Sequence, residues 1–539
     1  MIKRNDKRYL ISLCTQTADN RPGEIIEISV FALEEIVKNA LLKNQQKVFL
    51  KTEKNVVEFT TNELRLIIKM SKSQFKDQKM IPKTLRDYLI SISSQQISFE
   101  KENLSARFEE IDKIFTLLSS QFLCNAVLIG DHGVGKTAIV NEISRLITTK
   151  KCPEPFKNFR VIKIDTGALL ELEEQSRLKF KKVIENLLKF INNYNDKVIF
   201  YCDNLIHVKS SYNLYLFFNK LIKSSSVKLI FSGYFDDFNE YFIDDRNICK
   251  YLNVIPVYEP DIEELYPILK SRINKLENIY GVKISKEMIR FSILTGFVLA
   301  TPTSANPGCT LNIINYALSD AKIKNQDEVT KNNILPYYYI DFKSDKKLSQ
   351  ESKTSTAYHE AGHYLVAKMS PNIKDMKNAF VSILPIEGAY GLTAQYFNKE
   401  QPVILSKDYF IDQIAYSLGG RVGEAVYTNS FSAGARKDLQ DANSMAEEIV
   451  LTLGLSGLEG EENKTYALDM HVKDYLLTDE VKKRINSEII SIVQEAYKKA
   501  EKIIEDNIQL LEVIVDKLLD EKILTGDELD IICEEFKNS

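Results

Sequence analysis

Apolar residues stand at helical intervals in one part of the first hundred residues and alternate with polar residues in another. In residues 30–42, VFALEEIVKNALL, they recur three or four positions apart, which predicts an amphipathic helix. Residues 47–60, KVFLKTEKNVVEFT, alternate as half-buried strands do and predict a hairpin. We find no catalytic or binding motif in this segment, so residues 1–100 are expected to form an N-terminal domain of unknown role.

Between residues 101 and 260, apolar runs of strand length alternate with helical patterns. This order is typical of a parallel sheet whose strands are joined by crossover helices. A mainly helical segment follows at residues 261–332. The runs that predict strands are NAVLIG (125–130), FRVIKID (159–165), KVIFYCDN (197–204) and VKLIFSG (227–233).

The periodic pattern weakens at residues 333–355, NILPYYYIDFKSDKKLSQESKTS, which are rich in Ser, Lys and Asp. We interpret this stretch as a linker between domains. Residues 356–539 then combine helices with one or two strands and end in long amphipathic helices. A chain of 539 residues fits roughly three or four domains, so the expected fold class is multidomain α/β plus α.

The amino-acid composition argues against nucleic acid and membranes as binding partners. The 71 basic and 75 acidic side chains give a net charge of −4, which offers no broad field for nucleic acid or an anionic membrane. We see no secretory signal and no run of about 18 apolar residues, so a cytoplasmic protein without membrane insertion is expected. The seven cysteines include no C-x-x-C pair and predict reduced, buried thiols rather than metal ligands.

The segment VLIGDHGVGKTAIV follows an apolar strand and precedes a helical pattern. Its spacing predicts a phosphate-binding loop, because the glycines let backbone N–H groups turn toward phosphate oxygens. Lys136 is expected to reach the β and γ phosphates of ATP, and Thr137 to hold Mg²⁺. A chance glycine turn is the alternative, which the order of strand, loop and helix disfavours. The loop consists of Gly130, Asp131, His132, Gly133, Val134, Gly135, Lys136 and Thr137.

The run KVIFYCDN ends in Asp203, where a second strand can offer a carboxylate to the magnesium ion. Capping of the next helix is the alternative role of this aspartate. The stretch ARFEEIDKIFTLLSSQFLCNAVLIGDHGVGKTAIVNEISRLI and its continuation resemble the first ATPase domain of Clp-type AAA+ unfoldases over about residues 100–325. This resemblance implies a P-loop AAA+ parallel-sheet domain at residues 101–260 and a helical lid at residues 261–332.

The sequence departs from the Clp-type pattern at Asn204. Such ATPases place a glutamate there, which polarises the attacking water. An amide can orient water but cannot take its proton, so ATP hydrolysis is expected to be slow or absent. The paired arginine fingers of the family fall on Lys250 and Tyr251, which leaves one cation.

Residues 356–367, TAYHEAGHYLVA, place two of the chain's five histidines four positions apart around a glutamate. On a helix, His359 and His363 stand on one face and can offer two nitrogens to one metal ion. Zinc with three protein ligands keeps a position for water, and Glu360 would be the general base. A pair of exposed helix histidines is the alternative, but the apolar neighbours indicate a buried helix, where unpaired histidines are costly.

TAYHEAGHYLVA, LGGRVGEAVY (418–427) and SAGARKDLQDANSMAEEIV (432–450) are similar in order and spacing to the peptidase domain of the FtsH family of ATP-dependent zinc proteases. The resemblance covers about residues 351–535 and implies a mainly helical zinc-peptidase domain at residues 356–539. It also implies Asp438 as the third zinc ligand and Glu424 as a partner that orients an imidazole. For Glu424, an ordinary surface carboxylate is the alternative.

The apolar run AFVSILPIEGAYG at residues 379–391 predicts a strand beside the metal. We expect an edge strand that pairs with the substrate backbone, which would let a peptidase cut with little sequence preference. A plain core strand is the alternative.

The two resemblances together imply a soluble, ATP-linked zinc endopeptidase that forms a hexameric ring and acts on proteins or peptides. In one alternative, the first 330 residues bind ATP only for assembly or regulation. Another is an adaptor or chaperone-like protein with an inactive peptidase domain. Turnover of ATP would distinguish the first two.

Overall fold

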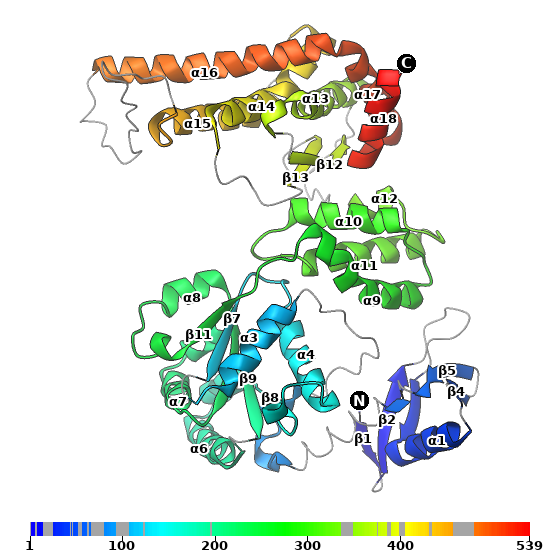
Figure 1. The fold of residues 1–539 in the computed structure, drawn as a ribbon, viewed down its shortest axis with the longest axis vertical. Coiled ribbons are helices and arrows are strands. Elements are labelled where there is room, and N and C mark those ends of the chain that lie inside the picture. Colours follow the sequence, from blue (N-terminus) through cyan, green and yellow to red (C-terminus); the bar gives the residue numbers. More distant parts are fainter. Residues whose placement is uncertain are drawn as a thin grey trace. The chain divides into compact units, whose positions relative to one another are not determined.

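The computed structural model describes most of the chain (Figure 1). Its residues divide into two compact units. One unit comprises Met1–Ile289 and Leu299–Thr330, and the other comprises Arg290–Val298 and Lys331–Ser539. The described residues are 2–5, 8–14, 25–43, 45, 47–51, 56–61, 64–65, 80–92, 107–121, 124–194, 197–335, 349–373, 376–384, 390–397, 405–430, 434–455 and 479–538.

The N-terminal segment contains the predicted helix and hairpin. Helix α1 (Val30–Leu42) and the antiparallel pair β4 (Lys47–Lys51) and β5 (Val56–Thr60) confirm the two patterns. The sequence did not reveal a three-stranded antiparallel sheet of β1 (Ile2–Asn5), β2 (Arg8–Cys14) and β3 (Ile25–Ser29).

A six-stranded sheet in the order β11-β7-β10-β9-β8-β6 follows. Its strands β7 (Asn125–Ile129), β8 (Arg160–Ile164), β9 (Val198–Cys202) and β10 (Lys228–Gly233) are parallel and confirm the four predicted runs. Two edge strands were not predicted, because each is only three or four residues long. They are parallel β11 (Asn253–Pro256) and antiparallel β6 (Leu89–Ser91).

Helices cover both faces of this sheet. Val127 and Ile129 of β7 belong to one buried cluster, whereas Ala126 and Leu128 belong to another, so successive side chains enter two cores. Strands buried on both faces explain the continuous apolar runs in the sequence. The helices are α3 (Phe108–Ser119), α4 (Lys136–Thr149), α5 (Thr166–Gln175), α6 (Arg177–Tyr194), α7 (Tyr212–Ile222) and α8 (Phe235–Tyr241).

The segment after the sheet is helical, as predicted. It contains α9 (Ile262–Tyr280), α10 (Lys286–Leu299), α11 (Gly308–Ile323) and the short α12 (Lys331–Ile334). Among the described residues, no helix has both the length and the apolar character needed to cross a membrane.

The second unit is mainly helical. Its first long helix, α13, spans Gln350–Met369 and therefore begins inside the stretch interpreted as a linker. The Ser349 hydroxyl accepts a hydrogen bond from the Ser352 backbone and caps the helix, so the Ser-rich composition there marks a helix start. The other helices are α14 (Lys407–Thr428), α15 (Arg436–Leu451), α16 (Asp479–Asp506), α17 (Ile508–Glu521) and α18 (Gly526–Asn538).

The expectation of an edge strand at residues 379–391 is wrong. Strand β12 (Met376–Ser382) is the centre of a three-stranded antiparallel sheet, between β13 (Leu392–Phe397) and β14 (Ile523–Thr525). Strand β14 comes from the far end of the chain, after Lys522 turns the backbone in a left-handed conformation at φ 67°. Such a long-range pairing leaves no local signal, and β13 is the edge strand instead; residues 385–389 lie outside the described residues.

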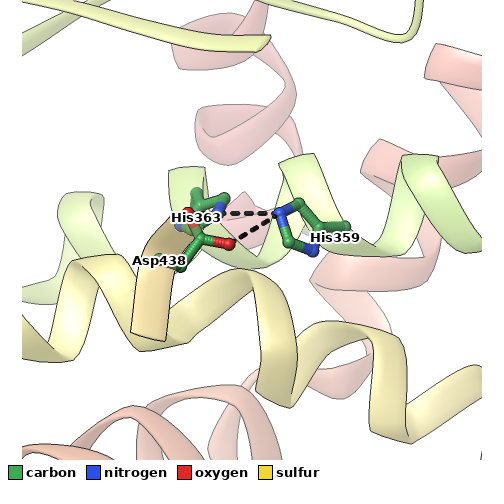
Figure 2. Close-up of side chains that lie close together, drawn as sticks. All are labelled: His359, His363 and Asp438. Atoms are coloured by element: carbon green, nitrogen blue, oxygen red, sulfur yellow. Dashed lines mark hydrogen bonds and ion pairs between the residues drawn. The ribbon is translucent and has the colours of Figure 1, made fainter. Parts of the chain in front are cut away.

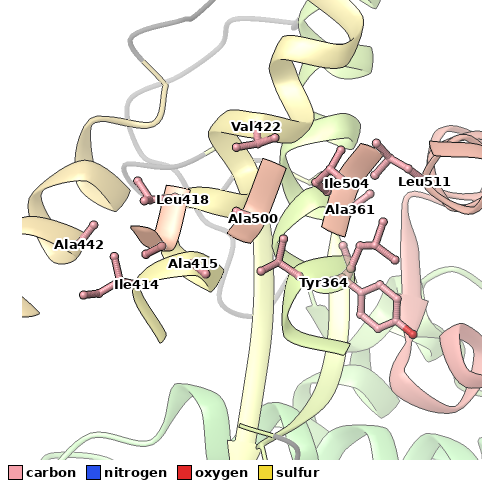
Figure 3. Packing of buried hydrophobic residues seen from close by; sticks show 14 of the residues in the cluster. Ala361, Tyr364, Ile414, Ala415, Leu418, Val422, Ala442, Ala500, Ile504 and Leu511 are labelled. Carbon is pink, nitrogen blue, oxygen red and sulfur yellow. The ribbon is translucent and has the colours of Figure 1, made fainter. Parts of the chain in front are cut away.

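Helices α13 and α14 touch backbone to backbone. A Cβ built on Gly419 would lie 2.8 Å from the Gly362 carbonyl oxygen, and one on Gly423 would overlap the Tyr358 carbonyl oxygen. Around this contact, Ala361, Leu418 and other small or branched side chains form one buried core with α15, α16 and α17 (Figure 3). The glycines of LGGRVGEA therefore allow a helix approach that no larger residue permits.

Gly419→Ala is expected to lower the free energy of unfolding by about 2 kcal/mol, because overpacking outweighs the helix propensity that alanine adds. Calorimetry of the transition of the unit that contains α13 measures the effect. Gly167→Ala is the matched control, since a Cβ there meets nothing nearer than the Asp165 carboxylate at 3.5 Å. Equal melting temperatures of Gly419→Ala and wild type would contradict the packing argument.

Candidate metal centre and phosphate loop

Three side chains from two helices converge at the HEAGH motif (Figure 2). The Nε2 atoms of His359 and His363, one helical turn apart on α13, are 3.0 Å from each other. Asp438, in the first turn of α15, places Oδ2 at 3.3 Å from His359 Nε2 and Oδ1 at 3.7 Å from His363 Nε2. The three residues predicted as metal ligands therefore form one cluster.

The opposite ring nitrogens of both histidines have their own acceptors. His359 Nδ1 lies 3.1 Å from Glu424 Oε1, and His363 Nδ1 donates to the Tyr416 carbonyl oxygen at 2.8 Å. These bonds place the protons on Nδ1 and leave the Nε2 lone pairs facing one point. Glu424 is buried rather than a surface carboxylate, and Tyr416 is a partner that no sequence motif indicated.

This arrangement fits a zinc ion. At 3.0 Å the two Nε2 atoms can share a proton or bind one metal ion, and tetrahedral zinc separates two imidazole nitrogens by roughly 3.3 Å. Burial alone would lower the pKa of His359, but hydrogen bonds to Asp438 and Glu424 raise it to about 10. The site therefore stabilises positive charge, and two histidines with one carboxylate are a donor set that zinc enzymes use.

The cluster has room for an ion only because residue 420 is glycine. A Cβ built on Gly420 would lie 2.7 Å from His359 Nε2 and still closer to His363 Nε2. The motif LGGRVGEA did not by itself predict this role for Gly420. The signal was present in the paired glycines, one of which packs the helices while the other faces the ligands.

Glu360, the predicted general base, is buried beside the cluster. Its Oε2 accepts a hydrogen bond from Thr393 Oγ1 at 2.8 Å, and a Cβ on Gly391 would lie 2.6 Å from its Oε1. Burial raises the pKa of Glu360 above its ordinary value, although the two histidines and Thr393 oppose the change. A carboxyl group in this environment is suited to taking up and releasing a proton.

Residues 130–137 lead from the end of β7 into α4, in the predicted order of strand, loop and helix. Gly133 and Gly135 adopt φ values of 101° and 100°, which favour glycine, and α4 begins at Lys136. Lys136 Nζ donates to the carbonyl oxygens of Gly130 and Asp131 at 2.7 and 2.8 Å. Burial lowers the pKa of Lys136 to about 8, against the opposing effects of Asp203 and Asp131.

Further loop contacts come from residues that the sequence analysis did not single out for this role. Tyr234 places its ring 4.6 Å from Lys136 Nζ and stacks on His132 with ring centroids 6.2 Å apart. Arg107 donates to the Val134 carbonyl oxygen at 2.9 Å. Thr137, the predicted Mg²⁺ residue, is the second residue of α4.

Asp203 and Asn204 follow β9 on the side of the loop. Asp203 accepts a hydrogen bond from Ser232 at 2.7 Å and pairs with Lys163 at 3.1 Å. Burial alone would raise the pKa of Asp203, but Ser232 and Lys163 outweigh it and hold the pKa below its ordinary value. Asn204 adopts a left-handed conformation at φ 61°, and its Nδ2 lies 3.3 Å from His207 Nε2.

Gly420→Ala is expected to weaken zinc affinity about 100-fold or more, because its Cβ occupies the space in front of the ligand nitrogens. Competition with a chelating dye measures the affinity, and circular dichroism checks that the helices persist. Gly167→Ala serves as the control. Wild-type affinity in Gly420→Ala would show that the metal lies elsewhere.

Comparisons with known proteins bear on the second unit. Residues 346–532 match the family model described as Peptidase family M41. "ATP-dependent zinc metalloprotease FtsH 4" of Synechocystis sp. is 33% identical over 286 residues, which cover 49% of this chain and 43% of that protein. "ATP-dependent zinc metalloprotease FtsH" of Caldicellulosiruptor bescii is 36% identical over 197 residues, which cover 34% of this chain and 31% of that protein.

These matches leave part of each protein uncovered, since this chain spans less than half the length of both relatives. A solved structure described as "Closed State CryoEM Reconstruction of Hsp104:ATPyS and FITC casein" covers 54% of this chain and 51% of its own, with 18% identity and a TM-score of 0.45. The family match contains the HEAGH helix, Glu424 and Asp438. Through its residues 346–532, the chain therefore carries a C-terminal domain that belongs to peptidase family M41.

Proposed function

We propose that the protein is an ATP-linked zinc metalloendopeptidase that hydrolyses peptide bonds of protein substrates. His359, His363 and Asp438 hold zinc, Glu424 orients His359, and Glu360 is the general base. Residues 130–137 bind ATP, with Asp203 as the carboxylate for Mg²⁺. In this proposal residues 101–260 are an AAA+ domain, residues 261–332 are its lid and six copies form a ring.

One observation carries the peptidase proposal. The Nε2 atoms of the two histidines lie 3.0 Å apart and face a carboxylate, while each Nδ1 atom has a hydrogen-bond acceptor of its own. An ordinary structural histidine pair needs no such arrangement. The buried Glu360 follows His359 directly, which places a candidate base beside the metal ligands.

The reaction divides between the metal and the chain. A bound zinc ion supplies Lewis acidity, which polarises the peptide carbonyl and makes water a nucleophile near neutral pH. Glu360 takes the proton of the attacking water and passes it to the leaving amine. Thr393 donates to one oxygen of the Glu360 carboxylate. Asp438 contributes carboxylate oxygens on the same side as the two Nε2 atoms.

The nucleotide site supports a second candidate for the first unit. Asn204 follows Asp203 where Clp-type ATPases have a glutamate, and its amide is bonded to His207 rather than to an acid. An amide cannot accept a proton from water, so nucleotide binding with slow turnover is favoured. In this version, ATP promotes assembly and the peptidase cuts unstructured chains without unfolding work.

Glu360→Gln is expected to keep zinc bound and to lower casein cleavage by about 100-fold to 10,000-fold, because the amide cannot take the proton. Fluorescein-labelled casein reports cleavage, and elemental analysis reports zinc. Glu447→Gln is the matched control, since this glutamate is exposed on α15. Full activity of Glu360→Gln would refute the assignment of the base.

Cleavage of casein is expected to depend on nucleotide. Parallel reactions with ATP, with a non-hydrolysable analogue and with no nucleotide separate the two versions, because only unfolding work requires turnover. Equal rates with ATP and the analogue would favour the regulatory version. Lys136→Ala should remove the dependence while zinc stays bound, and a wild-type rate that ignores nucleotide would contradict any ATP link.

A further inference from the structure

Strand β13 contacts the general base through one buried hydroxyl. Thr393 is 7% exposed, and its Oγ1 lies 2.8 Å from Glu360 Oε2 and 2.9 Å from the Glu360 carbonyl oxygen. A hydroxyl has a single hydrogen, so it donates to one of these oxygens at a time. The ionised carboxylate is the stronger acceptor, and Thr393 therefore fixes Glu360 when it is ready to act as a base.

Gly391, which directly precedes β13, restricts the second oxygen of the Glu360 carboxylate. A Cβ built on Gly391 would lie 2.6 Å from Glu360 Oε1 and 2.7 Å from its Cγ. The backbone of Gly391 thus passes close to one oxygen while Thr393 holds the other. Both oxygens of Glu360 are bounded by residues of one short segment, 391–393.

A single residue of α14 joins this segment to the metal ligands. The Tyr416 hydroxyl donates to the Thr393 carbonyl oxygen at 3.3 Å, and the Tyr416 carbonyl oxygen accepts from His363 Nδ1 at 2.8 Å. His363 and Glu360 lie three positions apart on α13. Hydrogen bonds through Tyr416 and Thr393 therefore connect the metal ligand His363 to the base Glu360.

We propose that Thr393 is a positioning residue of the peptidase, which holds the Glu360 carboxylate, and that Tyr416 fixes Thr393 relative to His363. This inference rests on the proposed peptidase function. Among the described strands, β13 pairs with β12 alone and is an edge of the sheet. An extended substrate added to that edge would stabilise the strand that holds the base, which links substrate binding to the geometry of proton transfer.

The test compares Thr393→Val with Thr393→Ser in the zinc-loaded full chain, with labelled casein as substrate. Valine keeps the volume but removes the hydroxyl, so kcat is expected to fall about 10-fold to 100-fold while KM and zinc content stay unchanged. Serine restores the donor and should recover most of kcat. Tyr416→Phe should keep zinc and lower kcat by a smaller factor, because it removes the bond that fixes Thr393 but keeps the Thr393 hydroxyl. Thr452→Val, at an exposed position, is the control.

The outcomes separate this inference from the proposed function. A wild-type chain that holds zinc but does not cut casein refutes the peptidase proposal, and this inference with it. An active wild type with Thr393→Val within twofold of its kcat refutes only the positioning role. A loss of zinc in Thr393→Val, or a Thr393→Ser as slow as Thr393→Val, would assign Thr393 a structural role and would also overturn the inference.

Discussion

The backbone contact between α13 and α14 is the constraint on which the metal centre depends. Because Gly362 meets Gly419 without side chains between them, the two helices approach closely enough for groups on α14 to reach the histidines of α13. Tyr416, Gly420 and Glu424 are four positions apart and form a stripe on α14 that faces this pair. Tyr416 and Glu424 accept hydrogen bonds from the imidazoles, while Gly420 leaves space for an ion.

The same contact explains the electrostatics of the site. Glu360, Glu424 and Asp438 bring three carboxyl groups around two imidazoles in a mostly buried region. Unpaired buried charge is costly, so a cation at the point where the ligand atoms meet would stabilise the folded domain. Metal binding and folding of this domain are therefore expected to be linked, as they are in other proteins whose ligands converge only in the native state.

The sequence predicted local features well and long-range ones poorly. Periodicity, which is a signal within one element, predicted the four strands between residues 125 and 233 and the HEAGH helix. Asp438 came from a family pattern, since spacing alone cannot say that the start of α15 returns to α13. The central position of β12 was missed because its partner β14 is about 140 residues away. Thr393 and Tyr416 were missed for a related reason, as their contacts join different elements and one of them uses a backbone carbonyl.

The two candidate sites differ in how ready they are for their ligands. At the metal centre the donor atoms already converge, so binding requires little rearrangement. In the phosphate loop, Lys136 is held by two loop carbonyls, and a nucleotide must compete for those hydrogen bonds. The Asn204 amide oxygen is buried and has no hydrogen-bond partner among the described residues. Water can reach this buried oxygen only if the side chain moves, so the proposed ATP site is expected to turn nucleotide over slowly.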